Sequence, residues 1–286
     1  MEGVLPVDKP VGPTSHDIVG MTRRALHTRR IGHTGTLDPF ASGLLLLCIG
    51  NATRLAEFLT RLPKRYRARL RLGQQTDTDD LTGRTVAESD GWRAVGPDRF
   101  EDVLVRFRGN ILQVPAAFSA KQRSGERAYR AARQGRAVAL EPVPVHIAEL
   151  RLAAWDPPHV ELDVACSTGT YVRALARDIG EALGVGAHLT ALRRTALGSH
   201  RVEDALAVDA LEDPACVHAA LIQPLDALAG MPRLPLDDDQ LRHVRQGRAL
   251  PLAHPPGTIA LVAHGELVAI GEADGELIRP RKVFHA

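Results

Sequence analysis

The chain has 286 residues, of which 44% are hydrophobic and 24% charged, a composition that excludes disordered, collagen-like and coiled-coil proteins. Its three cysteines are far apart and odd in number, which favours neither a disulfide framework nor a cysteine metal site. The longest apolar run, residues 44–49, is far shorter than a membrane span, and no signal peptide is visible, so we expect a cytoplasmic protein without a membrane partner.

Basic and acidic residues are sorted along the chain, although the net charge is only +2. Residues 1–72 hold 12 Lys or Arg against 5 Asp or Glu, whereas residues 203–240 hold one Arg and nine acids. Most of the 36 basic residues are Arg, whose guanidinium can bind a phosphate through two parallel hydrogen bonds. The clustering indicates a nucleic-acid partner, while a genomic bias toward Arg explains the Arg-to-Lys ratio alone equally well.

Strands and helices follow one another without a regular alternation, which favours the α+β class. Thr14 to Asp17 form a capping-box pattern that predicts the first helix, and Asn51 is expected to cap the second. The predicted strands are residues 3–7, 44–49, 64–72, 143–154, 159–165, 189–197, 258–263, 267–271 and 276–279. The predicted helices are residues 15–26, 51–62, 97–108, 126–134, 171–183 and 238–246.

The predicted strand 64–72 has the clearest pattern in the chain. Its sequence KRYRARLRL places four arginines on one face and Tyr66 with small and aliphatic residues on the other. A period of two predicts a strand that is buried on one side. The arginine face can be an ordinary solvated surface, and Tyr66 an ordinary core residue.

The character of the chain changes near its end. After Pro235 a short predicted helix precedes three short β-like stretches separated by Gly and Pro. We therefore predict a larger domain over residues 1–230 and a small β-rich module over residues 231–286.

Several common kinds of site are absent from the sequence. There is no Walker-type phosphate loop, no HExxH or CxxC motif, and no nucleophile elbow. Residues 77–83 resemble a calcium loop only superficially, because Leu81 stands at a ligand position, and we interpret them as a turn with exposed acids. We therefore expect neither a metal nor a cofactor.

One loop stands out, GHTGTLDPFASG at residues 32–43. Pro39 restrains the backbone of Asp38 toward extended geometry, while the glycines on either side allow sharp bends. The loop thus presents the Asp38 carboxylate from a conformationally restrained backbone position, shortly before the predicted buried strand 44–49. By itself such an Asp is most often a turn former.

The same loop, with the two residues after it, resembles the signature of the TruB family, the tRNA pseudouridine-55 synthases. Four further blocks resemble that family in the same order along the chain, covering residues 3–195 overall. These blocks are residues 3–10, residues 64–66 with 72–79, residues 115–121 with Gly125 and Tyr129, and residues 169–180 with 186–194. Ala116 and Ala117 depart from the bulkier residues expected in the third block, which concerns that connector and not the chemistry.

The resemblance implies a fold and a reaction. The fold is the pseudouridine-synthase fold, a central mixed and mostly antiparallel sheet flanked by helices, with a PUA-like C-terminal RNA-binding module. The reaction breaks the N1–C1′ bond of a uridine, turns the base and joins C5 to C1′, which requires no redox change, energy source or metal. Whether a carboxylate attacks C1′, attacks C6 or removes a sugar proton stays open.

The resemblance also implies roles for individual residues. Asp38 is the essential carboxylate, and Arg173 is the cation that keeps it ionised, since burial raises the pKa of a carboxyl group. Tyr66 stacks on the uracil. Tyr171 and Leu192 complete the pocket.

The target base lies in a tRNA loop and has to be extruded before its sugar can be reached. The resemblance makes His33 the candidate that fills the vacated space. The expected phosphate contacts are Arg65, Arg67, Lys121, Arg193 and Arg194, and residues 113–136 are expected to form a flap over the RNA.

Other interpretations remain open at this stage. A non-catalytic tRNA-folding chaperone uses the same basic surfaces but has no chemical use for Asp38 beside Arg173. A glycosidase normally needs two catalytic carboxylates, and only one stands out. A guide-RNA-dependent relative is a lesser alternative; we expect a stand-alone monomer that binds the tRNA T-stem–loop without a protein partner.

Overall fold

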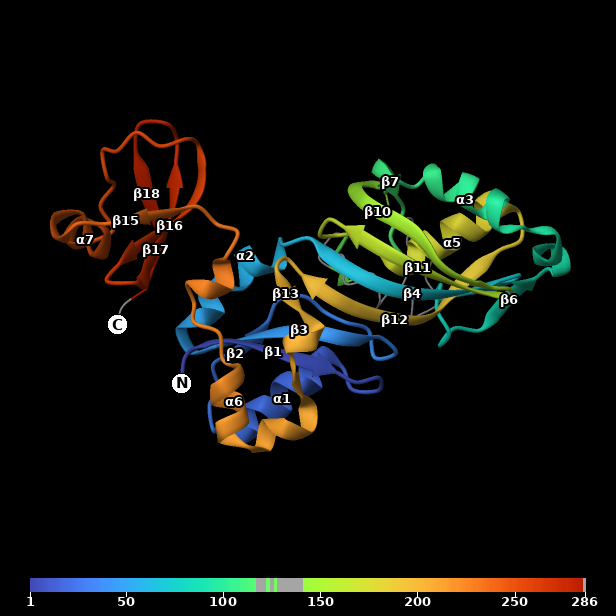
Figure 1. Cartoon of the computed structure of the whole chain (residues 1–286), viewed down its shortest axis with the longest axis horizontal. Helices are drawn as coiled ribbons and strands as arrows, with labels where there is room; N and C mark the ends of the chain where they lie inside the picture. The colour runs from blue at the N-terminus through green and yellow to red at the C-terminus, as the bar shows by residue number, and fades with distance from the viewer. Residues whose placement is uncertain (117–121, 124–125, 128–140, 285–286) are drawn as a thin grey trace.

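The structure is a computed structural model that describes residues 1–116, 122–123, 126–127 and 141–284 (Figure 1). The helices are α1 (Ser15–Ala25), α2 (Ala56–Thr60), α3 (Pro97–Val105), α5 (Val172–Leu183), α6 (Pro214–Ala220) and α7 (Asp238–Arg245), with 3-10 turns η1 (Gly50–Leu55), η2 (Asp90–Ala94), η3 (Val202–Asp204), η4 (Val208–Glu212) and η5 (Asp226–Leu228). The strands before residue 130 are β1 (Gly3–Lys9), β2 (Ile31–His33), β3 (Ser42–Ile49), β4 (Lys64–Leu72), β5 (Gln74–Thr76), β6 (Thr85–Glu88), β7 (Gly109–Gln113), β8 (Gln122–Arg123) and β9 (Glu126–Arg127). The later strands are β10 (Val143–Asp156), β11 (His159–Cys166), β12 (Ala187–Leu197), β13 (His200–Arg201), β14 (Leu206–Ala207), β15 (Arg233–Pro235), β16 (Gly257–Ala263), β17 (Glu266–Ala273) and β18 (Ile278–Val283).

A large mixed sheet runs through the body of the molecule (Figure 1). Its strand order is β14-β1-β3-β12-β4-β11-β10-β7, with β2 added beside β3 and β13 beside β12. The β1–β14 and β3–β12 pairs are parallel, and the other described pairs of this sheet are antiparallel. The predicted α+β class with a mostly antiparallel sheet is therefore confirmed.

Strand β4 shows the alternating burial that its sequence predicts. Its even-numbered residues are buried and its four arginines are exposed. The buried face packs on α3 and α5, where Phe100 and Leu175 belong to the same apolar core as Tyr66 and Leu70. A slip of one residue would expose this whole face to water, so the core fixes the register of β4.

The N-terminal half of the sheet has its own covering layer, in which α1 and α6 lie on one side of β1–β3 (Figure 1). Helix α1 begins with the predicted capping box, in which the Asp17 amide donates to Thr14 Oγ1 (3.1 Å) and the Thr14 amide donates to Asp17 Oδ2 (2.8 Å). None of the helices in the described part of the chain is both long and apolar enough to cross a membrane.

A four-stranded sheet, β15-β16-β17-β18, and helix α7 form the C-terminal end of the chain. This part packs directly on the body, because Leu267 and Phe284 share an apolar cluster with Leu55 and Phe58. Lys282 Nζ also lies 2.8 Å from Glu57 Oε1. The division of the chain at residues 230 and 231 stays a prediction.

Two local predictions are wrong. Asn51 does not cap a helix; it lies inside η1, and its Oδ1 accepts a hydrogen bond from Arg30 Nη1 (2.6 Å). A basic partner thus uses the side-chain oxygen that a cap would need. The predicted helix 126–134 begins instead as the short strand β9, and its other residues lie outside the described part.

The two halves of the sheet meet at a short parallel contact in which Ser42 and Gly43 of β3 pair with Arg193 and Arg194 of β12. Gly43 has a φ of +101°, and a Cβ atom at this position would lie 2.2 Å from the carbonyl oxygen of Arg194. Only glycine allows the two backbones to approach this closely.

We predict that Gly43→Ala destabilises the fold by about 3 kcal/mol or more, because it adds backbone strain to a clash that side-chain rotation cannot relieve. Gly32→Ala is the matched control, since no atom lies within 4 Å of a Cβ built there. Chemical denaturation of both variants measures the difference. Equal stability of the two variants would contradict this account of the β3–β12 contact.

Candidate active site

A cavity of about 280 Å³ lies where the loop between β2 and β3 faces the start of α5. It brings together, from distant positions in the chain, the five residues that the sequence analysis assigned to the reaction pocket. These are Asp38, Tyr66, Tyr171, Arg173 and Leu192. The remaining lining residues are Gly35, Thr36, Leu37, Thr60, Lys64, Thr168, Gly169, Thr170, Val172 and Arg194.

The loop that carries Asp38 is held by contacts on both sides. Lys9 is fully buried, and its Nζ donates to the carbonyl oxygens of Ala41 (2.7 Å) and Pro10 (2.8 Å). Ser15 Oγ accepts a hydrogen bond from the Leu37 amide (2.8 Å). These bonds tie a loop that lacks regular pairing to β1 and α1, so the position of the Asp38 carboxylate is defined by neighbouring elements.

Arg173, in the first turn of α5, reaches the Asp38 carboxylate. Its Nε lies 3.1 Å from Asp38 Oδ2, and its Nη1 lies 3.2 Å from Asp80 Oδ2. The Arg173 side chain is 8% exposed, against 36% for Asp38 and 4% for Asp80. One buried guanidinium therefore joins a carboxylate that opens into the cavity to a second carboxylate behind it.

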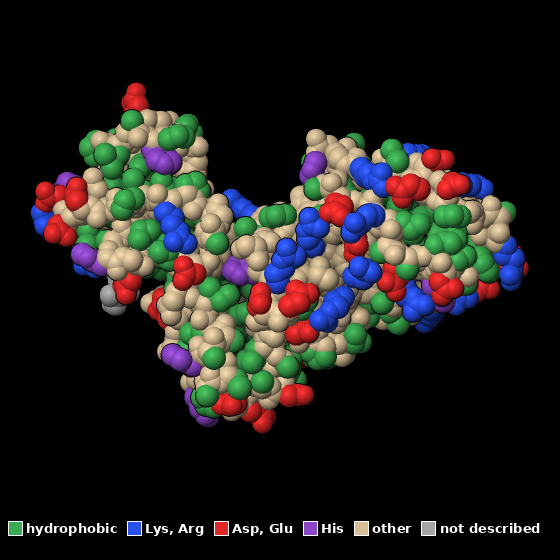
Figure 2. Space-filling model, in the orientation of Figure 1, with side chains coloured by type: hydrophobic (Ala, Val, Ile, Leu, Met, Phe, Trp, Pro, Cys, Tyr) green, Lys and Arg blue, Asp and Glu red, His purple; other side chains and the backbone are tan. Residues whose placement is uncertain are grey.

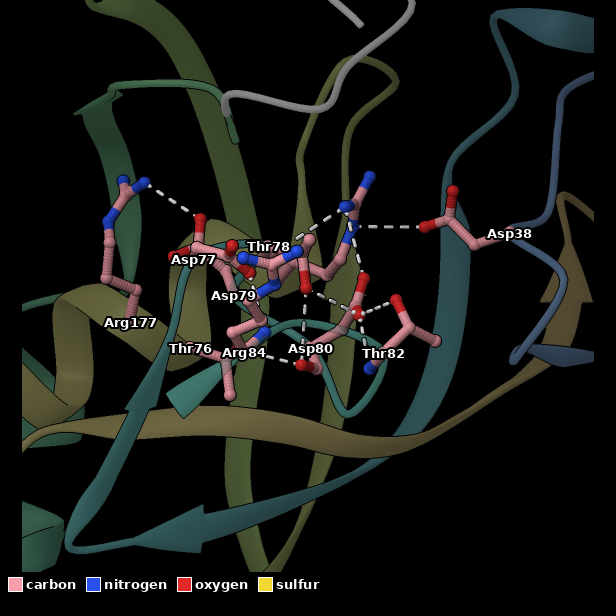
Figure 3. Close-up of polar contacts among 10 residues, drawn as sticks. Asp38, Thr76, Asp77, Thr78, Asp79, Asp80, Thr82, Arg84 and Arg177 are labelled. Atoms are coloured by element: carbon pink, nitrogen blue, oxygen red, sulfur yellow. Dashed lines mark hydrogen bonds and ion pairs between the residues drawn. The ribbon is translucent and has the colours of Figure 1, made fainter. Parts of the chain in front are cut away.

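Asp80 is the functional residue that the sequence analysis missed, because residues 77–83 were predicted to be a turn with exposed acids. The Oδ1 atom of Asp80 accepts from Thr78 Oγ1 (2.9 Å), Thr82 Oγ1 (2.6 Å) and the Thr82 amide (2.9 Å) (Figure 3). Its other oxygen is left for Arg173. The threonines two residues before and after Asp80 were the available signal, since such hydroxyls readily bond a nearby carboxylate.

A second ion pair lies one helical turn further along α5. Arg177 Nη1 is 3.0 Å from Asp79 Oδ2 (Figure 3), and Arg177 Nη2 donates to the Val114 carbonyl (2.8 Å). Burial raises the pKa of Asp79 to about 6 despite the neighbouring guanidinium. The consecutive acids Asp79 and Asp80 thus pair with arginines four residues apart on one helix face, which clamps the loop onto α5.

The electrostatics of Asp38 follow from this arrangement. Burial raises the pKa of Asp38, the charge of Arg173 opposes that rise, and the charge of Asp80 adds to it. The adjacent cation that the sequence analysis required is therefore present, although it does not fully cancel the effect of burial on the pKa.

Tyr66 and Leu192 line the cavity from neighbouring strands, β4 and β12. Tyr66 is 8% exposed on the buried face of β4, and burial raises the pKa of its hydroxyl. Leu192 is equally buried on β12. Tyr171 precedes α5, where its backbone amide donates to Gln113 Oε1 (2.9 Å) and its carbonyl accepts from Gln113 Nε2 (3.1 Å).

Arg65 and Arg67 lie on the opposite face of the sheet from the cavity. Arg65 Nη1 is 2.8 Å from Glu149 Oε2, and Arg67 Nε is 2.7 Å from Asp163 Oδ1. Figure 2 shows basic and acidic side chains interleaved over this part of the surface. Both arginines are thus paired with carboxylates and lie outside the cavity, and their expected contacts with RNA phosphates stay a prediction.

The other expected RNA contacts are also dispersed. Arg193 pairs with Asp8 (Nη2–Oδ2, 2.7 Å) outside the cavity. Half-buried His33 does not line the cavity either, but its Nδ1 accepts from the amide of Gly35, which does (3.3 Å). Arg194 was expected on the surface but is 1% exposed and cannot meet an external phosphate. Lys121 lies outside the described residues, as does most of the expected flap.

Within the described residues, no group of three or more His, Cys, Asp or Glu side chains is placed to hold a metal ion. The chemistry available from the side chains themselves is that of one carboxylate, its paired guanidinium and an aromatic wall. This set suits the stabilisation of charge at a sugar carbon beside a bound base.

Two family models match the chain. The model described as TruB family pseudouridylate synthase (N terminal domain) covers residues 23–172, and the model described as tRNA pseudouridylate synthase B C-terminal domain covers residues 173–229. Together they span the cavity and the elements that build it.

Curated relatives match almost the whole chain. The tRNA pseudouridine synthase B of Azoarcus sp. (strain BH72) is 42% identical, with 99% of this chain and 95% of the relative covered. The protein of that name from Burkholderia lata is 44% identical, with 98% and 83% covered.

Chains of solved H/ACA complexes share the fold. A chain from an H/ACA RNP bound to a substrate RNA containing 2′-deoxyuridine has a TM-score of 0.77 at 26% identity, covering 99% of this chain and 85% of its own. A chain from an archaeal box H/ACA sRNP Nop10–Cbf5 complex has a TM-score of 0.76 at 26% identity, with 99% and 86% covered.

We predict that Asp80→Asn lowers the pKa of the Asp38 carboxyl, because the negative charge of Asp80 raises that pKa in the wild type. A ¹³C NMR titration of the Asp carboxyl groups, with Asp38 assigned by its loss in Asp38→Asn, measures the change. Asp77→Asn is the control, because Asp77 is an exposed acid of the same loop and is absent from the charges that act on Asp38. An Asp38 pKa that stays constant or rises in Asp80→Asn would contradict the proposed coupling.

Proposed function

The chain belongs to the TruB family of pseudouridylate synthases, and we propose that it converts uridine 55, in the T-loop of tRNA, to pseudouridine. It is a pseudouridine synthase that isomerises a tRNA uridine. The choice of position 55 is supported by the five blocks of sequence that resemble the tRNA pseudouridine-55 synthases. One observation carries the chemistry: the Asp38 carboxylate opens into the cavity while Arg173 holds it by an ion pair of 3.1 Å.

In this proposal Asp38 acts at the sugar of the target nucleotide. Breaking the N1–C1′ bond makes C1′ electron-poor, and an ionised carboxylate can stabilise or capture such a centre. The carboxylate therefore has to be ionised, and Arg173 favours that state. Because the pKa of Asp38 is nevertheless raised, the rate falls on the acid side at a pH above the usual pKa of 3.8.

The remaining residues of the cavity position the base. We assign Tyr66 to stacking on the uracil, since the strand presents its ring to the cavity and aromatic rings hold extruded bases well. Leu192 provides an apolar surface, and Tyr171 completes the wall beside Arg173. The C5–C1′ bond then forms after the uracil turns within this enclosure.

The target base is stacked in its loop and has to leave the stack first. His33 is our candidate for the side chain that occupies the vacated space, because it ends β2 directly before the loop that carries Asp38 and accepts a hydrogen bond from Gly35 of that loop. Burial together with the charges of Arg194 and His16 lowers the pKa of His33, so it is neutral at pH 7 and can stack without a charge to solvate.

We propose that the enzyme acts as a monomer in the cytoplasm and needs no protein partner or guide RNA. The support is the identity of 42–44% to proteins named tRNA pseudouridine synthase B, against 26% to chains of H/ACA complexes. Contacts of Lys121, Arg193 and the arginines of β4 with RNA phosphates belong to the same proposal and rest on sequence resemblance alone.

Asp38→Asn is expected to abolish the reaction while RNA binding is retained. Removing the charge that acts at C1′ lowers the rate by on the order of 10⁴-fold or more. Release of tritium from tRNA labelled at uridine C5 measures turnover, and filter binding measures affinity. Equal release by wild type and variant removes Asp38 from its role, whereas tight binding without release by either protein favours the chaperone interpretation.

Tyr66→Phe and Tyr66→Leu test the stacking role. The Phe ring keeps the stacking surface, so we expect affinity for a T-stem–loop to be kept in Tyr66→Phe and weakened by about 1–3 kcal/mol in Tyr66→Leu. Equilibrium binding with catalytically inactive Asp38→Asn as the common background separates binding from turnover. Equal affinity of the two Tyr66 variants would rule out stacking as the function of this ring.

A further inference from the structure

Two buried cations, Lys64 and Arg194, line the cavity in addition to the residues assigned to the reaction and to the base. Lys64 is 8% exposed on β4 and Arg194 is 1% exposed on β12. Both side chains are fixed by backbone carbonyl groups. Lys64 Nζ donates to Thr60 O (2.8 Å) and Leu62 O (2.9 Å), while Arg194 Nε donates to Leu44 O (2.7 Å) and Arg194 Nη2 to Gly35 O (3.2 Å).

Neither cation forms an ion pair with a carboxylate in the part of the chain that the structure describes. The charged and titratable groups that act on Lys64 are Arg194 from β12 and Cys166 from β11, and both of these also act on Tyr66 of β4. Burial raises the pKa of Cys166 to about 11 and raises that of Tyr66, so both are neutral near pH 7. The pKa of Lys64 is lowered to about 8 by burial and by the charge of Arg194, which leaves it mostly protonated at pH 7.

The cavity therefore carries an excess of positive charge. Asp38 is the negative charge among the lining residues, against the positive charges of Lys64, Arg173 and Arg194. Counting Asp80, which shares Arg173 with Asp38 from behind, still leaves an excess of one positive charge among these five groups. Burying cations together is unfavourable, and neutral amide side chains could donate to the same carbonyl oxygens. The arrangement is favourable when negative charge enters or develops in the cavity.

The reaction creates such a charge. When the N1–C1′ bond breaks, its electron pair leaves with the uracil, whose negative charge is shared by N1, O2 and O4, and C1′ becomes electron-poor beside Asp38. When C5 attacks C1′, an electron pair of the base forms the new bond; C5 then loses its proton and N1 gains one. The charge on the base is transient, so donors that are already oriented stabilise it without reorganisation.

We propose that Lys64 and Arg194 supply a preorganised positive field that stabilises the departing uracil anion of this reaction. The base is the better match than an RNA phosphate, because both cations are nearly inaccessible to solvent and lie beside Tyr66, the residue assigned to stacking. Arg194 stands opposite Tyr66 in the β4–β12 register, and Lys64 shares the buried face of β4 with Tyr66. This inference rests on the proposed function.

The test removes the charge of Lys64 and keeps a side chain of similar length and shape. Lys64→Met loses the ammonium, Lys64→Arg keeps a positive charge, and Lys282→Met is the control that removes a lysine charge outside the cavity. Single-turnover conversion of a T-stem–loop RNA is measured at saturating enzyme, beside RNA affinity and thermal unfolding. We expect Lys64→Met to slow conversion by roughly 10²-fold with affinity kept, and Lys282→Met to match the wild type.

A base that leaves more easily than uracil tests whether Lys64 acts at the cleavage of the N1–C1′ bond. Fluorine at C5 stabilises the uracil anion, so a 5-fluorouridine target depends less on the positive charge of Lys64. We compare it with uridine at pH 6.5, where both bases keep their N3 protons. The ratio of the wild-type rate to the Lys64→Met rate should be several-fold smaller for the 5-fluorouridine RNA. Conversion is followed as loss of the N-glycoside. An equal deficit for both RNAs, or a Lys64→Met rate equal to that of the wild type, overturns the proposal. A wild type that converts neither RNA refutes the proposed function instead.

The pH profile provides a readout that does not depend on the folding of Lys64→Met. The wild-type rate should fall as Lys64 loses its proton near pH 8, and this limb should move to higher pH in Lys64→Arg. Because the pKa of Lys64 is about 8 in the folded protein and 10.5 in the unfolded chain, the unfolded chain binds this proton more tightly. The contribution of Lys64 to the free energy of unfolding therefore rises, and does not fall, between pH 8 and pH 10.5. The limb is therefore not caused by unfolding at this residue, and a limb that is unchanged in Lys64→Arg overturns the proposal.

Discussion

The ion pair between Arg173 and Asp38 is the interaction on which the rest of the site depends. A carboxylate that opens into a narrow cavity loses hydration, and its pKa rises unless a cation lies beside it. Arg173 has to be buried to reach Asp38, and a buried guanidinium needs partners of its own. Asp80 provides one, and the threonines around Asp80 complete its hydrogen bonding. Each charged group of the site therefore depends on the next one for its partner, from Asp38 in the cavity through Arg173 to Asp80 in the loop 76–83.

The need to pair buried polar groups also explains the buried cations around the Asp38 loop. This loop and the start of β4 have backbone carbonyl groups without partners in a sheet or helix, and an unpaired buried carbonyl is costly. Lys9 donates to Ala41 O and Arg194 to Gly35 O in the Asp38 loop, while Lys64 donates to Leu62 O just before β4. These cations fix the chain where it is least regular. The same cations also make the electrostatic potential of the cavity positive, which stabilises an anion that forms during the reaction. Structural and electrostatic roles are thus combined in the same side chains.

The two faces of β4 show how one strand separates these roles. Its inner face carries Lys64 and Tyr66 into the cavity, whereas Arg65 and Arg67 of its outer face pair with acids from β10 and β11. Exposed pairs of this kind contribute little to stability, about 0–1 kcal/mol each. The outer face thus carries the arginines of the proposed phosphate contacts, and the inner face carries the residues of the cavity.

Local patterns in the sequence determined much of the fold. The alternation of residues 64–72, the capping box at Thr14 and the continuous apolar run at residues 44–49 predicted β4, α1 and β3, because each depends on neighbours a few residues away. Asp38 was singled out by its loop and by resemblance to a family. Tertiary structure alone decided the burial of Asp80, the approach of β3 to β12 at Gly43, and the neutralisation of Arg65 and Arg67. These features join residues 80 and 173, or 65 and 149, and no local pattern records which distant charge a side chain will meet. The sequence thus defined which residues could do chemistry, and packing decided which of them share one cavity.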